Sequence, residues 1–324
     1  MSISRSRFCL AVIVLVLLSG TFLPAAESFS AKLVGKLKVG KAPHFADLSV
    51  NGRFLYVTAF ASNEVAIIDV NTLRSTGSFY AGYEPLGITV SSAGDKIFVT
   101  NRQNGLVKVV DAKTYQVIDD IKVGGRPANV VSSPSGQLLF VANWGTGKYG
   151  KVDVIDASTH RIIDEIPVGV TPITGVVSPL GDYLFLACAG SNDVWVIDIN
   201  SRKVVKQIPV GVQPAGVGTS TDGNTLYVAN SKSNDLSVID LLDLEEVRRV
   251  RVGKQPFSLD VDSSGRVYVV ESGDNTVSVF SPDLEKIGSF PVGKGAIDVD
   301  VTRDGRYAFV TAEKANRLFV FEIH

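Results

Sequence analysis

The stretch Gly211–Asp240, GVQPAGVGTSTDGNTLYVANSKSNDLSVID, is one complete unit of a pattern that recurs along the chain. It starts with Gly-x-x-Pro at Gly211 and Pro214 and has a second glycine, Gly223, nine residues after the proline. Two apolar segments follow, and the second ends at Asp240. A fixed internal period decides the architecture of a chain before any other feature does.

The unit occurs seven times at nearly constant spacing. Its opening glycines are Gly40, Gly82, Gly124, Gly169, Gly211, Gly253 and Gly293, at intervals of 42, 42, 45, 42, 42 and 40 residues. Proline follows three residues later except at Ala296, and a second glycine lies nine positions further on in all seven copies. Because chance does not keep one offset seven times, the chain is a repeat protein.

Each repeat predicts four short strands. A strand follows the proline, and a turn such as Asp222-Gly223 leads to a second strand such as Tyr227–Asn230. A third apolar strand, for example Leu236–Asp240, is followed by a more charged one, for example Val204–Val210, as expected at an outer edge. Four antiparallel strands in about 42 residues are typical of a β-propeller blade.

The last copy lacks a fourth strand. The chain stops at His324 after the third strand of that copy, while Ala31–Val39 precedes the first copy and has the character of a fourth strand. We therefore predict an all-β fold, a seven-bladed β-propeller of four-stranded antiparallel blades whose last blade is closed by the N-terminal strand.

The first 26 residues have the pattern of a secretory signal peptide. Two arginines precede the apolar run Phe8–Leu23, and Pro24-Ala25-Ala26 forms a small-residue exit. The alternative is an uncleaved membrane anchor, but 16 apolar residues are fewer than the roughly 20 that span a bilayer. We expect cleavage, no stable membrane insertion afterwards, a single domain over residues 27–324, and a periplasmic or secreted location.

Charge and cysteine content restrict the partners. Without the leader the chain has 30 basic and 33 acidic residues, a net charge of −3, which is not the electrostatic footprint of a dedicated nucleic-acid binder. Cys188 then has no intramolecular disulfide partner, so the core has to stabilise the exported protein. We expect a monomer.

The second-strand sequences Tyr227-Val228-Ala229-Asn230 and Phe98-Val99-Thr100-Asn101 resemble the YVTN β-propeller family, which includes periplasmic YncE-like proteins. The resemblance covers Lys32–His324 and implies the propeller fold. It implies no activity, because this family is known mainly by its repeat. Similar rings occur in lactonases of the phosphogluconolactonase type and in haem-binding nitrite reductases, so fold analogy supports several chemistries.

Departures from the repeat indicate a site on one face. We call the face formed by the loops before the prolines and after the second strands the upper face. In the third copy the loop Asn143–Gly150 is three residues longer than its counterparts and carries Trp144, Lys148 and Tyr149 among glycines. Such a tip can close on a ligand. The alternative is a surface loop whose aromatic residues pack on a neighbouring blade.

Charged residues at equivalent upper-face positions are further candidates. Arg102 and Arg126 come from adjacent copies and could hold an anion through their planar donor groups, the alternative being ion pairs with residues such as Glu84. Glu271 replaces an asparagine that three other copies have at the end of the second strand. It is a candidate for acid–base chemistry, or a substitution without function.

Histidines and channel acids suggest cofactor or metal sites. Residues 27–324 contain three histidines, too few and too scattered for a multi-histidine centre, although His44 could be an axial haem ligand. First strands line the channel of a propeller, and their polar positions could bind a cation such as Ca²⁺ or be solvated. These positions are Asp47, Asn129, Asp260, Asp298 and Asp300.

We predict an exported, non-catalytic binding or scaffold protein that uses the upper face and the 143–150 loop, without a cofactor, a bound metal or catalytic residues. Its ligand residues would be Arg102, Arg126, Trp144, Lys148, Tyr149, His44 and Glu271, and its partner an unknown small molecule or envelope protein. One alternative is a lactonase-like hydrolase with upper-face carboxylates and arginines. Another is a weak single-stranded nucleic-acid binder, for which the aromatic and basic residues are few.

Overall fold

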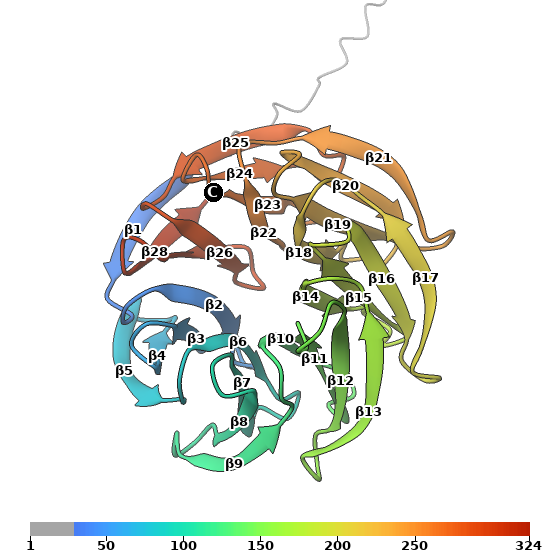
Figure 1. Cartoon of the computed structure of the whole chain (residues 1–324). Coiled ribbons are helices and arrows are strands. Elements are labelled where there is room, and N and C mark those ends of the chain that lie inside the picture. The colour runs from blue at the N-terminus through green and yellow to red at the C-terminus, as the bar shows by residue number, and fades with distance from the viewer. Residues whose placement is uncertain (1–28) are drawn as a thin grey trace, which may run out of the picture.

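The computed structural model describes residues 29–324, so the predicted leader lies outside the described residues. The described chain forms seven four-stranded antiparallel sheets arranged in a ring (Figure 1). This confirms the predicted seven-bladed β-propeller. Residues 29–324 contain no helix long and apolar enough to cross a membrane.

The strands follow one another in chain order around the ring. Blade 1 is β2 (Pro43–Leu48), β3 (Phe54–Ala59), β4 (Glu64–Asp69) and β5 (Arg74–Tyr80). Blade 2 is β6 (Pro85–Val90), β7 (Lys96–Asn101), β8 (Leu106–Asp111) and β9 (Val117–Lys122). Blade 3 is β10 (Pro127–Ser132), β11 (Leu138–Asn143), β12 (Gly150–Asp156) and β13 (Arg161–Val168). Blade 4 is β14 (Pro172–Val177), β15 (Tyr183–Cys188), β16 (Asp193–Asp198) and β17 (Lys203–Pro209).

The second half of the ring repeats this order. Blade 5 is β18 (Pro214–Thr219), β19 (Thr225–Asn230), β20 (Asp235–Asp240) and β21 (Glu245–Arg251). Blade 6 is β22 (Pro256–Val261), β23 (Val267–Glu271), β24 (Thr276–Phe280) and β25 (Lys286–Pro291). Blade 7 is β26 (Ala296–Val301), β27 (Tyr307–Ala312), β28 (Arg317–Ile323) and the N-terminal β1 (Ala31–Leu37).

Within each blade the first strand lies at the centre of the ring and the fourth at the rim (Figure 1). The second strands are almost wholly buried, since each is covered on both faces by neighbouring blades, whereas fourth strands such as β21 are mostly exposed. The core accordingly lies between blades. In one cluster Leu55 of blade 1 packs with Phe309 and Val320 of blade 7.

The N-terminal strand closes the ring. β1 pairs antiparallel with β28, from Ala31 opposite Ile323 to Leu37 opposite Leu318, so blue and red strands meet in Figure 1. Before β1, the ring of Phe29 stacks on Phe290 of blade 6 with centroids 6.4 Å apart. The closure therefore couples blade 7 to blade 6 as well as completing its own sheet.

Candidate functional site

A hydrogen bond between neighbouring blades recurs on the upper face. In five blades an asparagine with positive φ, just before the third strand, accepts the backbone N–H of a residue close to the start of the next blade's first strand. We call this the asparagine latch. The pairs are Asn63 to Glu84, Asn192 to Gln213, Asn234 to Gln255, Asn275 to Gly295 and Asn316 to Ala42, at 2.6–3.1 Å.

The latch is missing from blades 2 and 3. Gly105, with φ 63°, takes the position of the asparagine in blade 2, and the N–H of Arg126 is bound instead by Asn143 of its own blade at 2.9 Å. In blade 3 six residues separate β11 and β12, against four in every other blade. The upper-face loops of blades 2 and 3 therefore differ in geometry from those of the other copies.

A pocket of about 430 Å³ lies on the upper face where the latch is missing. It is lined by Phe60, Glu84, Arg102, Gln103, Gly125 and Arg126. This volume falls in the usual range for small-molecule sites, about 300–1,000 Å³. Neither arginine has an ion-pair partner among residues 29–324, and Glu84 has none either. The alternative, ion pairs of the arginines with Glu84, is therefore not formed, and the pocket contains two cationic groups to one anionic group.

Trp144 supports one of these arginines. The Arg102 guanidinium lies 4.3 Å from the centroid of the Trp144 ring, a cation–π geometry that orients the planar group. Trp144 itself packs against the core cluster that contains Phe45, and its Nε1 is buried without a hydrogen-bond partner. The first aromatic residue of the long loop thus faces inward and holds Arg102 over the pocket.

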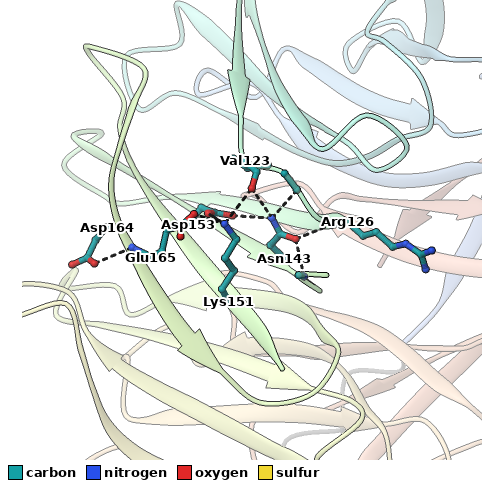
Figure 2. A network of polar contacts seen from close by, with 9 residues as sticks. Val123, Arg126, Asn143, Lys151, Asp153, Asp164 and Glu165 are labelled. Carbon is teal, nitrogen blue, oxygen red and sulfur yellow. Dashed lines mark hydrogen bonds and ion pairs between the residues drawn. The ribbon is translucent and has the colours of Figure 1, made fainter. Parts of the chain in front are cut away.

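A buried polar network fixes the base of the long loop (Figure 2). The side-chain amide of Asn143 donates to Asp153 Oδ2 at 2.9 Å, and Lys151 Nζ lies 2.6 Å from Asp153 Oδ1. Lys151 also reaches Glu165 of β13 and the carbonyl of Val123. Asp153 is fully buried, and this burial raises its pKa to about 6. In Figure 2 the side chain of Arg126 extends away from this network.

The other two candidates on the loop lie on its outer side. Lys148 Nζ is 5.2 Å from the centroid of the Tyr149 ring, and Tyr149 is 60% exposed. Tyr149 lines a second hollow, of about 520 Å³, together with Glu165 and Pro167 of the rim. Arg102, Arg126 and Trp144 therefore come together, whereas Lys148 and Tyr149 face a different surface.

His44 lies at the upper end of the central channel. Its ring is 4.6 Å from the Phe45 ring and 6.0 Å from the Phe257 ring of blade 6, measured between centroids. Burial, with a smaller effect of Arg102, lowers the pKa of His44 to about 4, so the imidazole is neutral at physiological pH. Its Nδ1 is buried without a partner. His44 is thus packed against aromatic rings of blades 1 and 6.

Glu271 stabilises the turn between blades 5 and 6. Only 3% of the residue is exposed, and its carboxylate accepts the N–H of Gly253 and the hydroxyl of Thr276, both at 2.7 Å. Two asparagines at the equivalent position bond the preceding turn as donors, Asn101 to the carbonyl of Ala81 at 2.7 Å and Asn143 to that of Gly124 at 3.0 Å. The structure does not bring Glu271 to the pocket between blades 2 and 3. Within the described residues no three His, Cys, Asp or Glu side chains converge as metal ligands.

Comparison with known proteins agrees with the propeller geometry. A family model described as "Cytochrome D1 heme domain" matches residues 30–219, more than half of the chain, and the protein belongs to this family. Among solved structures, a chain of Kuenenia stuttgartiensis hydrazine synthase superposes with a TM-score of 0.80 at 22% identity, covering 89% of this chain and 97% of that one.

A second solved structure, a functionally unknown protein from Desulfotomaculum acetoxidans DSM 771, gives a TM-score of 0.75 at 18% identity. It covers 83% of this chain and 92% of its own. No curated protein matches the sequence. At these identities the two structures establish a shared fold and nothing more about activity.

Proposed function

We propose that this protein is a non-catalytic binding protein whose upper-face pocket between blades 2 and 3 takes a small organic anion. The observation that carries the proposal is the pair of arginines, Arg102 and Arg126, that line one pocket without a carboxylate partner. Guanidinium groups bind carboxylates through paired N–H donors, and Phe60 adds an apolar wall for the body of the ligand.

The arrangement favours binding over hydrolysis. A lactonase-like reaction needs a carboxylate or another base within hydrogen-bond reach of the reacting atoms. Glu271 is occupied by Gly253 and Thr276, and among residues 29–324 only Glu84 brings a carboxylate to the pocket wall. Single-stranded nucleic acid is also less favoured, because Trp144 packs on the core and under Arg102 and so is not exposed with Tyr149 as a stacking surface.

The name of the matched family suggests that a haem could bind, but the residues of this chain do not fit a haem. Within the part of the chain that the structure describes, His44 is the one imidazole at the channel mouth, and it packs against Phe45 and Phe257. A metal-binding histidine normally donates its other N–H to an acceptor, whereas Nδ1 of His44 has none. His160 lies at the rim with Asp119, with its Nε2 buried. We expect the protein purified after haem supplementation to show no Soret absorption.

The resemblance to exported YVTN propellers supports a periplasmic or secreted location, with the leader removed and the ring acting as a monomer. An envelope protein remains the second candidate partner. The favouring observation is the outer side of the 143–150 loop, where Tyr149 is 60% exposed beside a hollow of about 520 Å³. Aromatic residues at such positions are typical of contact surfaces.

The proposal is tested by purifying the protein gently from its native envelope and identifying co-purifying small molecules by mass spectrometry. We expect an acid that is recovered with the wild type and lost from the double variant Arg102→Gln, Arg126→Gln. Arg161→Gln is the matched control, since Arg161 is an exposed arginine at the start of β13 on the opposite face. Equal recovery from the double variant and the control would refute the proposal.

A further inference from the structure

The central channel contains a cavity of about 240 Å³ that is separate from the upper-face pocket. Its walls are residues at the second, third and fourth positions after the prolines, among them Phe45, Asp47 and Asp260. No residue at the first position lines it, and His44 and Phe257, which occupy that level in blades 1 and 6, meet across the channel mouth. The cavity therefore lies below the level of these two aromatic rings, toward the lower face.

Three of the four aspartates in this cavity connect neighbouring blades. Asp47 of blade 1 accepts the N–H of Val90 in blade 2 at 2.8 Å, and Asp260 of blade 6 accepts the N–H of Val301 in blade 7 at 2.8 Å. Asp298 of blade 7 connects two neighbours, accepting the N–H of Ala46 at 3.0 Å and the hydroxyl of Ser258 at 2.6 Å. These carboxylates have a structural task that explains their burial.

Asp300 makes no such contact between blades. It occupies the same position in blade 7 that Asp47 and Asp260 occupy in theirs, but Asp298 already makes the contact to blade 1. Its Oδ2 is buried and has no hydrogen-bond partner, and no bond of Oδ1 is formed within residues 29–324 either. A buried carboxylate oxygen without a donor is rare in native proteins and indicates a missing partner.

We propose that the cavity binds a small primary alkylammonium ion, with its N–H groups on Asp300 and the neighbouring carboxylates and its alkyl part under Phe45. The lining contains no Lys, Arg or His, so nothing in the wall neutralises the acids. An ammonium group has three donors for several separate acceptors, and an aromatic face attracts a cation. A Ca²⁺ ion instead needs oxygens converging to 2.3–2.6 Å, and the described acids form no such group.

The titration of the same groups supports this ligand. Burial, followed by the charges of Asp298, Asp260 and Asp47, raises the pKa of Asp300 well above its ordinary value. Burial raises the pKa of Asp47 and Asp260 to about 6 and that of Asp298 to about 7. A cation favours the ionised forms, so binding must release protons and strengthen as pH rises from about 5 to 8.

The test is calorimetric titration of the full-length protein with n-butylammonium chloride at pH 5, 6.5 and 8, in buffers of different ionisation enthalpy. We expect binding that tightens at least tenfold across this range with proton release. Asp300→Asn should abolish it, and the fold should persist because this side chain makes no hydrogen bond. Asp243→Asn, at an exposed turn, is the control and should bind normally.

Three outcomes would overturn the proposal: no heat with n-butylammonium at pH 8, unchanged binding by Asp300→Asn, or binding without proton release. Calcium chloride is titrated in parallel, and Ca²⁺ binding that excludes n-butylammonium would replace the alkylammonium site with a metal site. A neutral analogue, n-butanol, separates charge recognition from simple filling of the cavity, and equal affinity for it would contradict the assignment.

Discussion

Replacing Glu271 tests whether its carboxylate is a structural part of the turn between blades 5 and 6. In Glu271→Ala the part-buried N–H of Gly253 and the hydroxyl of Thr276 lose the carboxylate acceptor that each contacts at 2.7 Å. Hydrogen bonds to charged groups contribute about 1.5–3 kcal/mol each, so the free energy of unfolding should fall by about 3–6 kcal/mol. Glu271→Gln retains one acceptor oxygen and should lose about 1 kcal/mol.

Guanidinium unfolding monitored by tryptophan fluorescence measures this difference. Glu285→Ala is the control, because this exposed glutamate makes no side-chain hydrogen bond and its removal should change stability by less than about 0.5 kcal/mol. An unchanged unfolding midpoint for Glu271→Ala would refute the structural role. Loss of a hydrolytic activity in a fully stable Glu271→Gln variant would instead support the lactonase alternative.

Three further predictions concern the ring. Deleting residues 27–39 should lower the melting temperature strongly, because β28 becomes an open edge; an equal melting temperature would show that closure by β1 is dispensable. A Cβ on Gly288 would lie 2.2 Å from the ring of Phe29, so Gly288→Ala should destabilise the wild-type protein. The same substitution should be nearly neutral in a protein that already has Phe29→Ala. A double-mutant cycle in thermal unfolding measures this difference. The channel aspartates have raised pKa values in the folded state, so the stability that they contribute is present near pH 4 and is lost as the pH rises through about 6 to 7. Asp300→Asn should reduce this loss. Identical profiles of stability against pH for the variant and the wild type would contradict the prediction.

The fold could be predicted from the sequence because each repeat shows its turn chemistry. Gly223 has φ 74°, and its equivalents keep the same left-handed turn in every blade, so glycine is required at a fixed offset. The closing strand was predictable for a related reason, since a seventh copy without a fourth strand leaves β28 unpaired unless Ala31–Leu37 supplies its partner.

The site was less predictable because it depends on contacts between repeats. Arg102 and Trp144 could be selected as candidates, but neither their stacking nor the opposite orientation of Tyr149 follows from loop length. The asparagine latch was overlooked, although asparagine before the third strand in five copies was visible in the sequence. The replacement of this asparagine by Gly105 in the second copy indicated where the pocket lies. The role of Glu271 in capping the turn could not be predicted, because it depends on where the fold places Gly253.

The most direct test of the anion-binding pocket is calorimetric titration with an aromatic carboxylate, 1-naphthoate, and its neutral amide at two salt concentrations. We expect that the carboxylate binds, that its affinity falls with added salt, and that Arg102→Gln with Arg126→Gln abolishes binding while Arg161→Gln does not. Equal binding of the neutral amide, or binding of 1-naphthoate that survives loss of both pocket arginines, would contradict it.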